Sequence, residues 1–178
     1  MKSKQFAKIL ILLVLVIIVG SIVWFFHHTG RLRNKIRNVI LISMDTTRAD
    51  FLSCYMSPSK TSPNIDTLAE EGILFENATS PIPFTLPAHC SMLTGTTPQY
   101  HGVLDNSFYR LSENNVTLAE RLKEKGFKTA AFVSTFILDS FFGMDQGFGL
   151  YDDNFTDERN PAGINERRGA DTTALAIK

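Results

Sequence analysis

An uncharged run of 18 residues near the start of the chain, Ile9 to Phe26, constrains the fold more than any other feature of the sequence. As a helix it would be about 27 Å long, close to the roughly 30 Å hydrocarbon core of a bilayer. Basic residues flank the run on both sides, and the aromatic residues at its end suit the membrane interface. We therefore predict an uncleaved transmembrane signal anchor over residues 9–28, with a cleaved signal peptide as the alternative.

Charge divides the chain at Asn38. Residues 1–37 hold seven of the 18 basic residues and none of the 18 acidic ones. Residues 1–8 form a short basic tail and residues 29–37 a basic linker, and both suit anionic lipid headgroups. The acidic remainder lacks the clustered Lys and Arg that phosphates require, which argues against nucleic acid as a partner. The two flanks are similarly basic, so the positive-inside rule does not fix the orientation. We expect a single-pass membrane protein with an extracytoplasmic domain.

Residues 38–178 alternate strand-like and helix-like patterns. Asn38–Met44 is a continuous, partly β-branched apolar run, typical of a strand buried on both faces of a parallel sheet. Two shorter runs, Ile73–Phe75 and Thr129–Val133, predict further strands. Helical patterns are predicted at 62–72, 87–95, 117–125 and 170–178. Together these units predict an α/β domain with a mixed, mostly parallel sheet flanked by helices.

Two polar residues stand where such a fold binds its ligands. Asp45 follows the first apolar run at the carboxyl edge of the predicted sheet, where it can bind a hard cation or cap the next turn. Thr85 precedes a helix opened by Pro87, where unpaired N–H groups and the helix dipole favour an anion such as sulfate or phosphate. A metal on its hydroxyl would lower the hydroxyl pKa and create a nucleophile, whereas Thr85 alone would be an ordinary helix cap.

Several motifs, in order, resemble the N-terminal half of sulfatase-like proteins of the alkaline phosphatase superfamily. They are Asn38–Asp50, Thr61–Asp66, Leu68–Gly72, Phe75–Ala78, Thr85–His89, Leu93–Gly95 and His101-Gly102. The resemblance implies a mixed α/β sandwich in which Asp45 binds a divalent cation, one of Ca, Mn, Zn or Mg. It implies that Thr85 is both a metal ligand and the nucleophile that attacks a sulfate or phosphate ester. His89 is assigned to catalysis and His101 to substrate binding, with a structural role open for each.

The resemblance is incomplete around the nucleophile. Sulfatases carry Cys or Ser followed by x-Pro-x-Arg and oxidise it to formylglycine, but oxidation of Thr85 could give only a ketone. His89 stands at the arginine position, and Thr46 replaces a second acidic ligand. Residues Phe132–Phe136 lack the Lys and His of a later family segment. A threonine nucleophile is more similar to the phosphodiesterase and phosphoalkyl-transferase branches of the superfamily.

The set of metal ligands is short. Asp45 and Thr85 supply fewer than the roughly six oxygens that a hard cation prefers, and no Asp-His pair follows Thr85. Four later aspartates are candidates only in principle, and the last two are expected in a solvated loop: Asp139, Asp145, Asp152 and Asp153. Residues 38–178 are therefore interpreted as a partial catalytic domain that lacks a C-terminal half. The predicted function is a membrane-anchored, metal-dependent hydrolase or transferase of a sulfate or phosphate ester. The alternative is an inactive fragment or pseudoenzyme.

Two further pairs of residues have structural interpretations. Arg48 and Asp50 are expected to pair with each other or to brace the turn rather than to take part in chemistry. Cys54 and Cys90 are expected to be buried free thiols, because two cysteines make no disulfide framework and their spacing fits no zinc motif.

Overall fold

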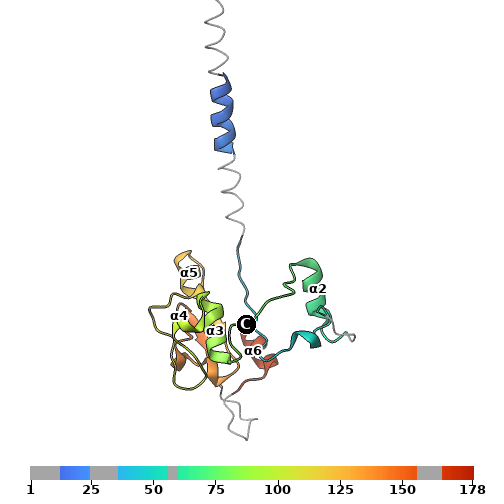
Figure 1. The fold of residues 1–178 in the computed structure, drawn as a ribbon, viewed down its shortest axis with the longest axis vertical. Coiled ribbons are helices and arrows are strands. Elements are labelled where there is room, and N and C mark those ends of the chain that lie inside the picture. Colours follow the sequence, from blue (N-terminus) through green and yellow to red (C-terminus); the bar gives the residue numbers. More distant parts are fainter. Residues whose placement is uncertain (1–12, 25–35, 56–59, 156–165) are drawn as a thin grey trace, which may run out of the picture. The chain divides into compact units, whose positions relative to one another are not determined.

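The structure, a computed structural model, describes residues 13–24, 36–55, 60–155 and 166–178 (Figure 1). The chain divides into two compact units, Met1–Met44 and Asp45–Lys178. In the first unit, residues 13–24 form a helix with exposed apolar side chains, Trp24 at 67%. No helix among the described residues is both long enough and apolar enough to cross a bilayer. The other residues of the predicted anchor, 9–12 and 25–28, lie outside the described ranges.

The strands predicted at Asn38–Met44 and Ile73–Phe75 are wrong. Both runs lack regular secondary structure, and Ile40, Ile42 and Ile73 are 83%, 76% and 81% exposed. The apolar pattern of each run indicates a preference for burial. A strand also needs a neighbouring strand to pair with its N–H and C=O groups, and the pattern contains no information on that partner.

The helices of the second unit follow the predicted pattern closely. The longer ones are α2 (Pro63–Glu71), α3 (Thr85–Thr94), α4 (Pro98–His101), α5 (Leu118–Glu124) and α6 (Gly169–Ala176). Three short 3-10 turns accompany them: η1 (Ala49–Phe51), η2 (Phe136–Leu138) and η3 (Ser140–Phe142). Local signals explain their ends. Thr117 and Glu120 form a capping box at the start of α5, and Gly95 ends α3 in the left-handed conformation.

Two parallel strands form the sheet in the described part of the chain. They are β1 (Ala130–Phe132) and β2 (Leu150–Asp152), with Ala131 opposite Tyr151. β1 confirms the strand predicted at Thr129–Val133, and the α/β class is confirmed. An isolated antiparallel bridge joins Thr135 to Glu166 beyond the end of β1.

The hydrophobic core of the second unit is built around α3. Leu86 and Cys90 of α3 are fully buried against a group of loop and turn side chains: Val103, Leu111, Leu138, Phe142 and Met144. Burial raises the pKa of the Cys90 thiol to about 12. Both cysteines are free, as predicted, but Cys54 is only partly buried. The core therefore fixes α3 along its length.

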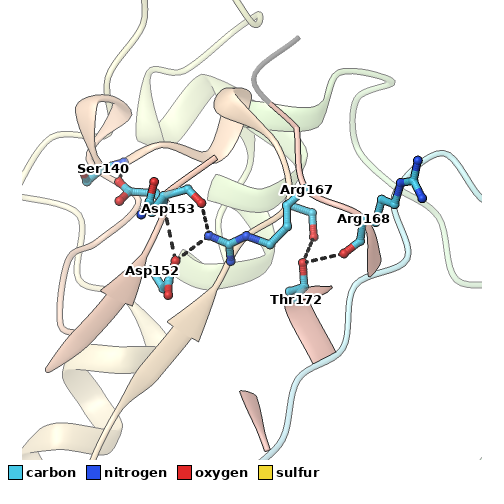
Figure 2. Close-up of polar contacts among 8 residues, drawn as sticks. Ser140, Asp152, Asp153, Arg167, Arg168 and Thr172 are labelled. Atoms are coloured by element: carbon cyan, nitrogen blue, oxygen red, sulfur yellow. Dashed lines mark hydrogen bonds and ion pairs between the residues drawn. The ribbon is translucent and has the colours of Figure 1, made fainter. Parts of the chain in front are cut away.

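Asp152 and Asp153 do not lie in the predicted solvated loop. Asp152 ends β2 and pairs with Arg167 at 2.5 Å, and the side chains of the two residues are only 25% and 7% exposed. Asp153 Oδ2 accepts a hydrogen bond from the Ser140 N–H at 2.9 Å. Hydrogen bonding from Ser140, first by its side chain and then by its backbone N–H, holds the pKa of the Asp153 carboxyl below the usual range. Figure 2 shows these contacts beside the residues that open α6. The prediction was wrong because nothing near the aspartates in sequence indicates the arginine that pairs with them.

Candidate active site

The side chains of Asp45 and Thr85 are in contact. Thr85 Oγ1 donates a hydrogen bond to Asp45 Oδ2 at 2.9 Å, and the Thr46 N–H donates to Asp45 Oδ1 at the same distance. Adjacent oxygens in an octahedral shell of about 2.1 Å radius lie about 3 Å apart, so this spacing fits two ligands of one hard cation. The functional interpretation requires that the side chains of Asp45 and Thr85 lie close together, and they do. The roles of the two residues in catalysis and metal binding stay predictions.

Thr85 is the first residue of α3 and does not cap it. The N-cap residue is Phe84, no side chain caps the helix, and α3 begins two residues before Pro87. The hydroxyl of Thr85 is turned to Asp45 instead of to a backbone N–H. Thr85 is therefore not a helix cap, and this alternative interpretation is wrong.

Few backbone donors remain at the start of α3. The Leu86 N–H donates to Asn106 Oδ1 at 2.9 Å, Pro87 has no N–H, and the Ala88 N–H donates to the Phe84 carbonyl at 3.1 Å. Among the described residues, the Thr85 N–H is the donor of this first turn that has no partner. The helix start therefore offers an anion a single backbone N–H, fewer than the sequence pattern alone indicates.

Asn106 is the residue of this site that sequence analysis missed. It lies in the loop after α4 (Pro98–His101), and its contact with Leu86 spans 20 residues. No spacing or periodicity in the sequence indicates that contact. A polar residue in a loop is ordinary, so its position became evident only from the fold.

The turn after Asp45 is strained. Thr46 has a φ of 56°, and it is the one residue other than glycine with a positive φ in the described part of the chain. A β-branched residue in this conformation costs about 1–3 kcal/mol, and such strain is concentrated at functional sites. Arg48 and Asp50, which follow the turn, pair at 2.6 Å as predicted.

His89 lies one helical turn after Thr85 on α3. Its Nδ1 is 2.8 Å from the Thr85 carbonyl oxygen. A carbonyl oxygen can only accept, so Nδ1 carries the proton in this contact. His89 is thus held beside the Asp45 and Thr85 pair by the same helix.

His101 lies in the interior, with 4% of its surface exposed. Its Nδ1 accepts the Val103 N–H at 3.2 Å, so the proton is on Nε2, which donates to Ser91 Oγ at 3.0 Å. Burial lowers the pKa of His101. These contacts connect α4 to α3 and support the structural alternative for His101, whose substrate-binding role stays a prediction.

The candidate metal ligands at this site are two oxygens, a carboxylate and a hydroxyl. Within the described residues, no three His, Cys, Asp or Glu side chains are grouped closely enough to hold a metal ion. The two oxygens from Asp45 and Thr85 are the donor type that Mg²⁺, Ca²⁺ and Mn²⁺ prefer. They fit a hard cation in kind and in spacing, and they fill part of its shell.

Comparisons with known proteins identify the family of the chain. The sulfatase family model matches residues 37–176. The chain is 36% identical to iduronate 2-sulfatase of Mus musculus over 101 residues, which cover 56% of this chain and 18% of that protein. It is 37% identical to arylsulfatase A of Homo sapiens over 97 residues, 52% of this chain and 19% of that protein. It is 36% identical to an ulvan-active sulfatase of Formosa agariphila over 93 residues, with 52% and 18% covered. The chain thus spans about a fifth of the length of the curated relatives it matches. A family model that matches most of the chain, with the motif residues Asp45 and Thr85 in contact, shows that this chain belongs to the sulfatase family.

Proposed function

We propose that this chain provides the nucleophile of a metal-dependent hydrolase or transferase that acts on a sulfate or phosphate ester. The observation that carries the proposal is the 2.9 Å contact between Thr85 Oγ1 and Asp45 Oδ2. Membership of the sulfatase family supports ester cleavage as the class of reaction. A bound divalent cation would supply a Lewis acid that stabilises charge on oxygen and lowers the pKa of the Thr85 hydroxyl.

The nucleophilic step follows from the contacts of Thr85. Its Oγ1 attacks the sulfur or phosphorus atom as the hydroxyl proton passes to water, and Asp45 Oδ2 orients the hydroxyl by accepting its hydrogen bond. The bond from sulfur or phosphorus to the alcohol oxygen then breaks. Negative charge on the transferred group is stabilised by the Thr85 N–H and the positive end of α3. Water completes a hydrolysis, and a second alcohol completes a transfer.

We assign the proton for the departing alcohol to His89. The ring belongs to the same first turns of α3 as Thr85, and its Nδ1 proton is held by the Thr85 carbonyl. Nε2 would therefore give its proton to the departing alcohol from the doubly protonated ring, and the neutral ring would take a proton back from the water or alcohol that completes the reaction. His89→Gln tests this role. The variant should lose turnover of esters with a poor leaving group more strongly than that of nitrophenyl esters, because nitrophenolate leaves without a proton.

The experiment measures metal content and ester turnover of the 178-residue chain. Substrates are 4-nitrophenyl phosphate, bis(4-nitrophenyl) phosphate and 4-nitrophenyl sulfate, each with Mn²⁺, Mg²⁺, Ca²⁺ or Zn²⁺ and after treatment with a chelator. We expect metal-dependent turnover that Thr85→Ala abolishes and Thr85→Ser retains in part. Undiminished activity of Thr85→Ala would remove Thr85 from its role. The preferred ester identifies the reacting atom, sulfur or phosphorus.

We also propose that residues 9–28 anchor the chain in a membrane, with the second unit extracytoplasmic. Support comes from the uncharged run Ile9–Phe26 and from the exposed apolar side chains of the helix at 13–24. Cell fractionation should recover the chain in the membrane pellet after alkaline extraction. A variant with Leu15 and Ile18 replaced by lysine should be released, and release of the native chain by the same treatment would contradict the anchor.

A further inference from the structure

Ser62 is the N-cap residue of α2, but its side chain does not cap the helix. A serine at this position normally accepts an N–H of the first helical turn and stabilises the helix start. The hydroxyl of Ser62 instead accepts the N–H of Ser53, nine residues earlier in the chain. Asp66, in the first turns of the same helix, also contacts Ser53 through its carboxylate. The start of α2 is therefore bonded to another segment.

Ser53, Ser62 and Asp66 form a closed set of hydrogen bonds. The Ser53 N–H donates to Ser62 Oγ at 2.9 Å, and the Ser62 N–H donates to Ser53 Oγ at 3.1 Å. Each hydroxyl then donates to one carboxylate oxygen of Asp66, Ser53 to Oδ2 at 2.7 Å and Ser62 to Oδ1 at 3.2 Å. Ser62 is 8% exposed and the other two residues are partly buried, so water competes weakly for these bonds. We call these three residues the serine clamp.

The serine clamp holds the segment that follows Asp45. Backbone hydrogen bonds of 3.0–3.2 Å join residues 48–55 into consecutive turns. Ser53 lies within those turns, and the Thr61 hydroxyl donates to the Phe51 carbonyl in the same segment. The clamp therefore fixes residues 48–55 to the start of α2.

The turn between Asp45 and this segment needs such support. Thr46 has a φ of 56°, and a β-branched residue keeps this conformation only where the surrounding structure enforces it. In this conformation the Thr46 N–H donates to Asp45 Oδ1, while Asp45 Oδ2 accepts the Thr85 hydroxyl. The described residues before Asp45, 36–44, form no helix or strand. The regular hydrogen bonding that can enforce the turn therefore lies after Asp45.

We propose that Asp66 is a positioning residue of the active site. Through Ser53 and Ser62 it keeps Thr46 in the left-handed conformation and thereby holds the Asp45 carboxylate against Thr85. This inference rests on the proposed function and adds a residue to it. It also gives a role to the motif Thr61–Asp66, whose serine and aspartate act together in the clamp.

The first measurement needs no metal. It is the rate at which the Thr46 N–H exchanges with water, followed by NMR on the metal-free 178-residue chain. Ser53→Ala opens the clamp and keeps the charge of Asp66, whereas Asp66→Ala removes both acceptors. We expect Thr46 to exchange about tenfold faster in either variant than in the native chain. Native exchange at Thr46 in Ser53→Ala would overturn the proposal, because the clamp would then act on α2 alone.

The second measurement is the affinity for Mn²⁺, determined by calorimetry on the folded chain. A mobile Asp45 must be ordered when the cation binds, so Ser53→Ala should bind Mn²⁺ about tenfold more weakly. A clamp that served stability alone would lower the thermal midpoint and leave this affinity at the native value, which would also overturn the proposal.

The matched control is Glu70→Ala. Glu70 lies one turn after Asp66 on α2 and is exposed. Its replacement takes the same charge from the same helix and leaves the clamp intact, so Thr46 exchange and Mn²⁺ affinity should stay native. Equal effects of Glu70→Ala and Asp66→Ala would assign the change to charge and contradict positioning.

Failure of the proposed function is a separate result. It is observed as turnover that survives Thr85→Ala, or as a native chain that binds no divalent cation. In both cases the exchange rate of Thr46 still decides whether Asp66 holds the turn after Asp45.

Discussion

Thr85 Oγ1 donates a hydrogen bond to Asp45 Oδ2 at 2.9 Å, although 40 residues separate the two in sequence. The other carboxylate oxygen of Asp45 accepts the N–H of Thr46, whose backbone is in the left-handed conformation. The carboxylate therefore connects the strained turn after residue 44 to the first residue of α3. Any change to its charge should affect both a bound cation and the Thr85 hydroxyl.

Replacing Asp45 with asparagine tests this connection. The amide keeps the size of the side chain and one acceptor but loses the charge that attracts a divalent cation. We expect Mn²⁺ affinity, measured by calorimetry, to fall about 100-fold. Asp50→Asn is the matched control, because Asp50 lies in the same segment and pairs with Arg48 instead. Equal Mn²⁺ affinity of the native chain and Asp45→Asn would show that the cation is held elsewhere.

Two variants of Asn106 separate its role in holding the start of α3 from the effect of a charge placed there. Asn106→Ala leaves the Leu86 N–H without its acceptor, so we expect the unfolding free energy to fall by about 1–3 kcal/mol. Ester turnover should fall as well. Asn106→Asp keeps an oxygen at that position and adds a negative charge at the positive end of α3, which should restore stability. The same charge repels an anionic substrate, so the KM of Asn106→Asp for the ester should be higher than that of the native chain. Stability and activity that recover together in Asn106→Asp would contradict this separation.

Local sequence signals predicted the helices well and the sheet poorly. The apolar periodicity and the proline and glycine residues that limit α2, α3 and α5 act over a few residues, and those helices formed within about two residues of their predicted ends. Asn38–Met44 carries an equally clear apolar pattern but forms no strand. A strand depends on a partner far away in sequence, which a local pattern cannot report.

The same distinction holds at the site. Asp45 and Thr85 could be predicted because each stands in a recognisable motif at the boundary of a secondary-structure element. Asn106 could not, since it acts through one long-range hydrogen bond with no accompanying motif. Outside the site, the ion pair of Arg167 with Asp152 was hidden for the same reason. The burial of His101 could not be predicted either, because its motif does not indicate that the ring is buried against α3.

Protonation of His101 should make stability depend on pH. Burial lowers the pKa of His101, so the folded state binds fewer protons than the unfolded state between that lowered pKa and about 6.5. Unfolding free energy should therefore be highest above pH 6.5 and fall as the pH drops below it. Denaturant unfolding at a series of pH values measures this slope.

Two variants assign that slope to the imidazole. His101→Gln keeps a donor for Ser91 but cannot accept the Val103 N–H, so it should cost about 1–3 kcal/mol above pH 7 and flatten the slope near pH 6. Ser91→Ala keeps the buried imidazole and should keep the slope. A slope that persists in His101→Gln would assign the effect to another group.

The ion pair between Arg167 and Asp152 should stabilise the fold far more than the exposed pair between Arg48 and Asp50. The side chains of the first pair are 7% and 25% exposed, against 71% and 55% for the second. Arg167→Met leaves Asp152 partly buried without its cation and should lower the unfolding free energy by about 2–3 kcal/mol. Arg48→Met should leave the denaturation midpoint unchanged, because water screens that pair. Asp152→Asn in the Arg167→Met background removes the stranded charge, so the double variant should be more stable than Arg167→Met alone. A double variant that is less stable would mean that Asp152 is held by its other contacts and does not depend on the guanidinium.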